Sequence, residues 1–187
     1  MATPVLSQPG RKLFREIDNR RTAGIVYVAA LISSLTLAAL AIHGFHPYAE
    51  DGGLYLTGIK RMLDPTLYEA SREFVLGHIR FSLFAPGIAW VVRGSGLPLM
   101  TVVLLVHLAS IWLTLFAAWM LTGRCFGSVR ERTSAICLLA VWLTLPVAGT
   151  SLMVMDPYGT ARSISTPLIL FALAGAIDFL QSTRLGE

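Results

Sequence analysis

The sequence has little charge for its length. Asp, Glu, Lys and Arg make up 14% of the 187 residues, whereas hydrophobic residues make up 55%. Soluble globular domains carry about 25% charged residues, so this composition has more apolar surface than a water-soluble core can bury. The surplus apolar surface must therefore face lipid. The composition therefore predicts an integral membrane protein.

Motifs for several chemistries are also missing. Cys125 and Cys137 fall in a predicted cytoplasmic loop and inside a predicted helix, which gives neither a disulfide framework nor metal-ligand spacing. The sequence has no Gly-rich phosphate loop, no His-Glu-x-x-His pattern, no Ser-His-acid arrangement and no ladder of intramembrane charges, which disfavours nucleotide hydrolysis, intramembrane proteolysis and transport. The net charge of +4 does not indicate a nucleic-acid partner, because the basic residues lie at the ends of apolar runs.

Four apolar runs are long enough to cross a bilayer as helices. They cover residues 24–42, 97–121, 134–154 and 163–180, and Asp178 is the one Asp, Glu, Lys or Arg within them. A spanning helix needs roughly 20 residues to cross ~30 Å of hydrocarbon. We expect a single all-α membrane domain, a polytopic helical bundle with a leader at 1–22 and an outer loop at 43–96. A cleaved signal peptide is the alternative for the first run.

The basic residues predict the orientation of these runs. Five Lys and Arg precede the first run and three lie in residues 123–133, which places the N-terminus and that loop in the cytoplasm. With four spans the C-terminus is cytoplasmic as well. We expect the protein to lie in the inner (plasma) membrane of the cell. The polar segments 43–80 and 155–162 then face the same outer side.

The outer loop contains two shorter apolar patterns. Apolar residues recur at helical spacing over residues 54–63, which indicates an amphipathic helix on the membrane surface that ends at Asp64 and Pro65. The run at residues 81–92 is too short for a span and contains Pro86. It suits a re-entrant or interfacial helix.

Ionisable side chains gather just outside the first span. His43, His46, Glu50 and Asp51 lie within nine residues of one another. A carboxylate that is partly desolvated at a membrane surface becomes more basic, which suits it to deprotonate a hydroxyl or to hold a divalent cation. The simpler alternative is that Asp51 caps the surface helix and Glu50 is solvated.

A second polar segment precedes the last span. It offers Asp156, Tyr158 and Arg162, and an arginine can hold a lipid-linked phosphate through two parallel hydrogen bonds. The alternative is that Asp156 caps the last helix, with Pro157 at its first position, and that Arg162 reaches to the membrane interface.

This order of elements resembles the N-terminal part of the GT-C superfamily, polytopic glycosyltransferases that use polyprenyl-phosphate-linked sugars. The stretch from Asp51 to Tyr55 reads Asp-Gly-Gly-Leu-Tyr. It is similar to the Asp-Glu-x-x-Tyr stretch of the mannosyl and aminoarabinose transferase branches, with Gly52 in place of the second acid. Residues 81–90 and 122–127 are similar to the juxtamembrane run and to the basic ending of the second span in that family.

The resemblance implies sugar transfer from a dolichyl- or undecaprenyl-phosphate donor. Asp51 would be the base or a metal ligand, with Glu50 beside it, and a divalent metal ion would lie at Asp51 and Asp156. The implied substrate-binding residues are His46, Tyr55, Asp156, Tyr158 and Arg162. Because GT-C enzymes have more spans than four, we expect either the N-terminal part of a longer protein or a shortened relative.

Two other interpretations remain open. One is a metal site formed by His43, His46, Glu50, Asp51 and His78. The other is a non-catalytic accessory subunit of a larger membrane complex, in which His107, deep in the second span, ligates a haem or a chlorophyll. A hydrogen bond from His107 to a neighbouring helix is the simpler explanation of that residue.

Overall fold

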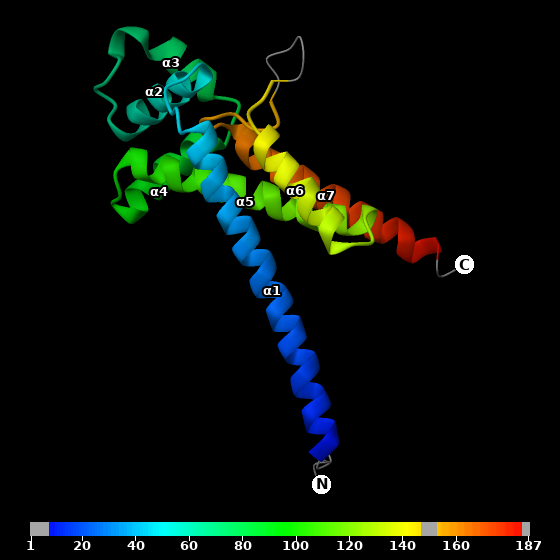
Figure 1. Cartoon of the computed structure of the whole chain (residues 1–187). Helices are drawn as coiled ribbons and strands as arrows, with labels where there is room; N and C mark the ends of the chain where they lie inside the picture. Colours follow the sequence, from blue (N-terminus) through cyan, green and yellow to red (C-terminus); the bar gives the residue numbers. More distant parts are fainter. Residues whose placement is uncertain (1–7, 147–152, 185–187) are drawn as a thin grey trace.

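The described chain is built from helices. The computed structural model describes residues 8–146 and 153–184, and their regular elements are all helical. They are α1 (Gln8–His43), α2 (Asp51–Leu63), the 3-10 helix η1 (Glu69–Ser71), α3 (Arg72–Ile79), α4 (Phe84–Ser95), α5 (Leu99–Cys125), α6 (Val129–Trp142) and α7 (Ala161–Arg184). Helix α5 is central, because it packs against α1, α4, α6 and α7. Figure 1 shows α2, α3 and α4 gathered at one end of the long helices.

Three helices are long and apolar enough to cross a membrane. They are Thr22–His43 within α1, the whole of α5, and Ala161–Thr183 within α7. They coincide with the predicted runs at 24–42, 97–121 and 163–180. Large apolar side chains on all three are exposed, among them Leu37, Leu105 and Leu168, as expected for surfaces that face lipid. These helices indicate a membrane protein.

The expected span at 134–154 is not a spanning helix in the structure. Helix α6 ends at Trp142, and its 14 residues extend about 21 Å, short of the ~30 Å hydrocarbon core. Pro146 explains the end, because a proline ring clashes with the carbonyl four residues earlier, here that of Trp142. The chain later returns to this point, where the Met155 N–H donates to the Leu143 carbonyl at 2.9 Å. The rest of the expected span, 147–152, lies outside the described residues.

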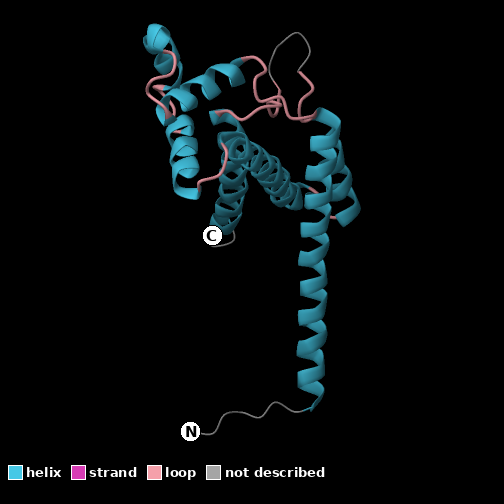
Figure 2. Cartoon of the chain, turned by 90° about the vertical axis from the view of Figure 1, so that its left-hand side faces the viewer, coloured by secondary structure: helices cyan, strands magenta, loops and turns pink. Residues whose placement is uncertain are grey.

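Most of the expected leader is helical, because α1 begins at Gln8. Figures 1 and 2 show the N-terminal half of α1 extending away from the other helices.

The helices of the outer loop follow local signals. Helix α2 stops at Leu63, directly before Asp64 and Pro65 as predicted, and Asp64 Oδ1 accepts hydrogen bonds from the N–H and hydroxyl of Thr66. Helix α4 continues through Pro86 because this residue lies in the first turn, where an N–H has no helical acceptor. It ends at Gly96, whose φ of 68° favours glycine. The position of these helices on the membrane surface stays a prediction.

Two apolar cores hold the helices together. One joins the membrane-crossing helices and α6 around Ile32, Leu115 and Ile136. The other joins α2, α3 and α4 to the start of α5, and Ile59, Ile79 and Ala85 are among its buried residues. We call α2, α3 and α4 the cap. The second core fixes the cap on α5, and so fixes the start of α2, where Asp51 lies.

Candidate functional site

The two predicted polar segments meet at the cap end of the molecule. The His46 N–H donates to the Pro157 carbonyl at 3.0 Å, which ties the chain after α1 to the chain before α7. This contact brings Glu50 and Asp51 to the segment 153–160. We call this group of residues the outer cluster: Glu50, Asp51, Asp156, Tyr158, Thr160 and Arg162.

Tyr158 makes the direct link within the outer cluster. Its hydroxyl donates to Glu50 Oε2 at 3.1 Å, and its side chain is 3% exposed. Burial, followed by the negative charge of Asp156 and the hydrogen bond to Glu50, raises the pKa of Tyr158 to about 12. The charge of Asp51 acts in the same direction. Tyr158 is therefore a hydrogen-bond donor at neutral pH.

Gly52 permits this contact. A Cβ atom at this position would lie 2.7 Å from the Pro47 carbonyl oxygen and 3.0 Å from the Tyr158 ring. A larger residue would therefore not fit at position 52 without a shift of the backbone.

Glu50 has an unusual backbone conformation. It stands at the N-cap of α2 with φ 43° and ψ −125°, and a conformation of this kind costs a non-glycine residue on the order of 1–3 kcal/mol. The Tyr158 hydrogen bond holds the side chain of this strained residue. Such strain is concentrated at functional sites, where the surrounding contacts maintain it.

Asp51 begins α2 and is exposed. The alternative in which it caps the helix is wrong, since Glu50 occupies the N-cap and no side chain makes a capping hydrogen bond there. Asp51 is thus a carboxyl group that solvent or a substrate can reach.

Asp156 is the buried acid of the outer cluster. Its side chain is 4% exposed, and its Oδ2 accepts a hydrogen bond from the Thr160 hydroxyl at 3.0 Å. The Nε atom of Arg162 lies 3.4 Å from the same oxygen, so the buried charge has a counter-charge. Asp156 does not cap the last helix, because α7 begins five residues later at Ala161. The Arg162 side chain is 43% exposed, which leaves part of the guanidinium accessible.

Other predicted site residues lie outside this contact network. Tyr55 packs edge-on against Phe84, with ring centroids 5.8 Å apart, and His46 contributes its backbone while its side chain is exposed. Both ring nitrogens of His43 have hydrogen-bond partners. Its Nε2 lies 3.0 Å from the Ala140 carbonyl and its Nδ1 lies 2.7 Å from the Thr144 hydroxyl.

The metal-site interpretation finds no preformed ligand group. Among the described residues, no three His, Cys, Asp or Glu side chains form a group that could hold a metal ion, and the side chain of His78 lies outside what is described. Asp156 Oδ2 is already held by Thr160 and Arg162. As they stand, these residues do not fit a preorganised metal site.

His107 is enclosed within the protein. Its side chain is 2% exposed, and its ring lies against that of Phe45, with centroids 5.3 Å apart. Its Nδ1 has no hydrogen-bond partner, so the simple explanation of a bond to a neighbouring helix does not account for this atom.

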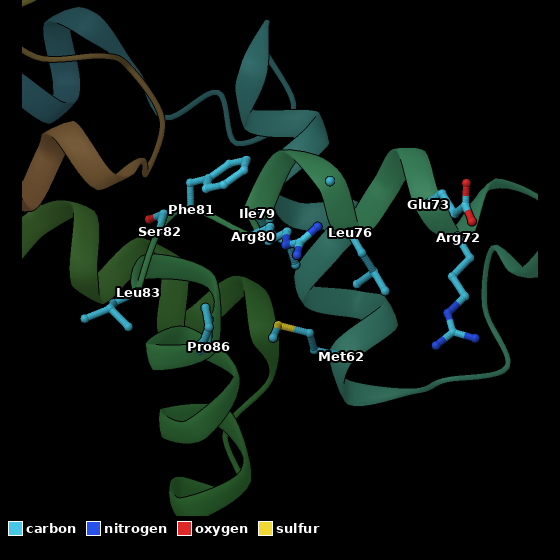
Figure 3. A pocket seen from close by; sticks show the side chains of 11 residues that line it. Met62, Arg72, Glu73, Leu76, Ile79, Arg80, Phe81, Ser82, Leu83 and Pro86 are labelled. Carbon is cyan, nitrogen blue, oxygen red and sulfur yellow. The ribbon is translucent and has the colours of Figure 1, made fainter.

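Two hollows lie near the outer cluster. An apolar groove of ≈ 460 Å³ between α4, α5 and α7 starts at Ala161, next to Arg162, and is lined by Ile88, Val106 and Leu168 among others. A second hollow of ≈ 940 Å³ lies within the cap. Figure 3 shows its lining, with Arg72 and Glu73 on one side and with Phe81, Leu83 and Pro86 on the other. None of the predicted site residues lines this second hollow.

Sequence reasoning missed part of this arrangement. Thr160 and Ser163 were not singled out, yet the Thr160 hydroxyl bonds Asp156 and the Ser163 hydroxyl accepts from the Thr160 N–H at 3.1 Å. A signal existed, since both residues flank Arg162 at the start of an otherwise apolar helix. Polar residues at such a position usually serve the backbone or a buried partner.

Comparison of the chain with known proteins finds no relative: no family model, no curated protein and no solved structure matches it.

Proposed function

We propose that this chain forms the donor-binding end of a GT-C-type membrane glycosyltransferase, which transfers a sugar from a polyprenyl-phosphate donor. The observation that carries the proposal is the outer cluster itself. An accessible acid, Asp51, lies beside the part-buried Tyr158–Glu50 contact and the Asp156–Arg162 pair, at the end of apolar helices. The similarity of residues 51–55 to the GT-C pattern points the same way.

Asp51 is assigned the role of general base. It accepts the proton of the acceptor hydroxyl while that oxygen forms a bond to the anomeric carbon of the sugar. The bond between the anomeric carbon and the donor phosphate oxygen breaks, and polyprenyl phosphate leaves with the electron pair. Asp51 is exposed at the start of α2, where an acceptor hydroxyl can approach it.

Arg162 is assigned to the departing phosphate. Its Nε faces Asp156, and the exposed part of its guanidinium can donate to phosphate oxygens. The negative charge on the leaving group grows during transfer, so this contact becomes stronger in the transition state. Asp156 and Thr160 act as positioning residues, since they hold the arginine and its segment in place.

The ≈ 460 Å³ groove suits the isoprenoid chain of the donor. It begins at Ala161, one residue before Arg162, and continues along Ile164 and Leu168 of α7. A lipid whose phosphate lies at Arg162 could therefore place its first isoprene units against α4 and α7. This arrangement keeps the reacting carbon near Asp51.

The test is transfer from polyprenyl-phosphate mannose in proteoliposomes that contain the protein. We expect Asp51→Asn to lower transfer by about 100-fold or more, the scale of losing a general base. Asp64→Asn is the matched control, because it changes an exposed aspartate at the other end of α2. Equal transfer by wild type and Asp51→Asn would reject the proposed role of Asp51.

Binding of polyprenyl phosphate provides a readout that does not depend on turnover. Native mass spectrometry should show weaker retention by Arg162→Gln than by wild type, with Arg93→Gln as the control. If the wild type neither transfers the sugar nor retains polyprenyl phosphate, the glycosyltransferase assignment is wrong.

A second candidate function is that of a non-catalytic subunit in a larger membrane complex. It is favoured by the low burial of two spans, since 17% of the apolar window is buried in both α1 and α7. A native complex larger than the 20.3 kDa chain, together with no transfer activity, would support this candidate.

A further inference from the structure

A third hollow, which is a groove separate from the two described above, lies at the opposite end of α5 from the outer cluster. It has a volume of ≈ 900 Å³ and runs between α1, α5 and the start of α6. Its wall is apolar where Ile25 and Val28 of α1 and Trp112 and Phe116 of α5 line it. A hydrogen bond of 3.1 Å between the hydroxyls of Tyr27 and Thr133 joins α1 to α6 beside it.

One end of this groove is positively charged. Arg124 and Arg132 line it, and no acidic residue is among the described residues that do so. Arg124 is paired with Asp178 of α7, with 2.8 Å between Nε and Oδ1. The charge that remains without a carboxylate partner, within the described part of the chain, is therefore that of Arg132.

Arg132 is held in place, and its side chain is half-buried. Its guanidinium lies 4.1 Å from the centre of the Trp119 ring, and its Nη2 donates to the Trp119 carbonyl at 3.1 Å. Its Nε is buried without a hydrogen-bond partner, so the part of the guanidinium that a ligand can reach is the exposed remainder. The guanidinium also rests on Gly123, where a Cβ atom would lie 2.9 Å from Nη2. The cation is thus fixed by stacking and by close approach to the backbone of α5.

The dimensions of the groove match one leaflet of a bilayer. Along α5 it extends from Trp112 to Gly123, about 17 Å at 1.5 Å per residue, which is close to half of the ~30 Å hydrocarbon core. Tyr27 and Trp119 line its charged end, and such amphipathic rings are enriched at headgroup level.

We propose that this groove binds an anionic glycerophospholipid, with one acyl chain along the apolar wall and the phosphodiester at Arg132. Charge complementarity selects this occupant. An apolar wall that ends in fixed arginines suits a lipid with net negative charge better than a zwitterionic lipid, whose own cation would face Arg124 and Arg132. The site lies away from the outer cluster and does not depend on the proposed sugar transfer.

Native mass spectrometry of the full chain tests this proposal. The protein is released from nanodiscs that contain equal amounts of phosphatidylglycerol and phosphatidylcholine with identical acyl chains. We expect wild type to retain phosphatidylglycerol preferentially, and Arg132→Gln to reduce this preference by about fivefold, the effect expected for one arginine at a membrane surface. Arg130→Gln is the matched control, because it removes the same charge from the same turn of α6 but does not line the groove.

Three outcomes would overturn the proposal. They are equal retention of the two lipids by wild type, equal losses in Arg132→Gln and Arg130→Gln, and a second copy of the chain that excludes lipid from the groove.

Photo-labelling keeps the test decisive if Arg132→Gln fails to fold. Phosphatidylglycerol with a diazirine in its acyl chain should label peptides from residues 24–29 and 112–123 of the wild type. Labelling spread evenly over α1, α5 and α7 would contradict a defined site. An Ala29→Trp variant, which fills the apolar wall without changing charge, should lose this labelling.

Discussion

At the scale of single residues, Tyr158 connects the two halves of the candidate site. Its hydroxyl reaches Glu50, and its ring lies where any side chain at position 52 would be. The sequence predicted that Glu50 and Tyr158 would face the same side of the membrane. It could not predict their hydrogen bond, because the contact depends on how residues 153–160 return over the end of α6.

We predict that Tyr158→Phe destabilises the protein by about 1–3 kcal/mol, the range for a hydrogen bond to a charged acceptor. The pKa of Tyr158 is raised to about 12 in the folded protein, against about 10 for a free tyrosine. Its contribution to stability is therefore present below pH 10 and is lost as the pH rises from 10 to 12. Unfolding midpoints of wild type and Tyr158→Phe, measured across this range, should converge.

Tyr48→Phe is the matched control for this experiment, since Tyr48 is an exposed phenol in the outer loop, close to Glu50 in the sequence. A difference between wild type and Tyr158→Phe that stays constant up to pH 12 would contradict the raised pKa.

Gly52 shows where a residue pattern and a structure give different information. In the sequence it is a departure from the Asp-Glu-x-x-Tyr stretch. In the structure it is required by the Pro47 carbonyl and the Tyr158 ring. Comparison of short motifs records which residue is absent, whereas the reason for its absence lies in a contact between distant segments.

At the scale of elements, hydropathy was sufficient for α1, α5 and α7 but not for α6. The three helices are apolar over more than 18 residues, so length alone identifies them. The run at 134–154 is equally apolar, yet α6 stops at Trp142. The local effect of Pro146 on the preceding turn outweighs the hydropathy of the run. Helices α3 and η1 were missed because helices of eight residues or fewer are too short to show a clear periodicity.

The start of α6 offers a prediction at this scale. Ser128 Oγ accepts a hydrogen bond from the Glu131 N–H, and the Glu131 carboxylate accepts one from the Ser128 N–H, which together form a capping box. We predict that Ser128→Ala destabilises the protein by about 1 kcal/mol. Tryptophan fluorescence during denaturant unfolding would measure the loss.

A matched comparison is Glu131→Gln, which keeps an acceptor at the same place and should cost less than Ser128→Ala. A larger loss for Glu131→Gln than for Ser128→Ala would show that the charge at the helix start contributes more than the Ser128 cap.

At the scale of the whole molecule, charges of opposite kind lie at opposite ends of α5. The acids Glu50, Asp51 and Asp156 lie near its start, whereas its end carries Arg124 and is followed by the first turn of α6, with Arg130 and Arg132. The 27 residues of α5 extend about 40 Å, which is long enough to place its two ends on different sides of a ~30 Å hydrocarbon core. The orientation predicted from the basic residues places the arginine end in the cytoplasm.

This orientation gives the last prediction, which uses the exposed thiol of Cys125 at the end of α5. In intact cells that produce a Cys137→Ser variant, a membrane-impermeant maleimide should label Cys125 only after permeabilisation, because the arginine end faces the cytoplasm. A second variant, with Tyr48→Cys and both native cysteines replaced by serine, should be labelled in intact cells, since Tyr48 is exposed in the outer loop. Labelling of both positions from outside would show that α5 does not cross the membrane. Reversed accessibility would keep the three spans and invert them, which would move the outer cluster to the cytoplasm and exclude a donor sugar presented on the outer face.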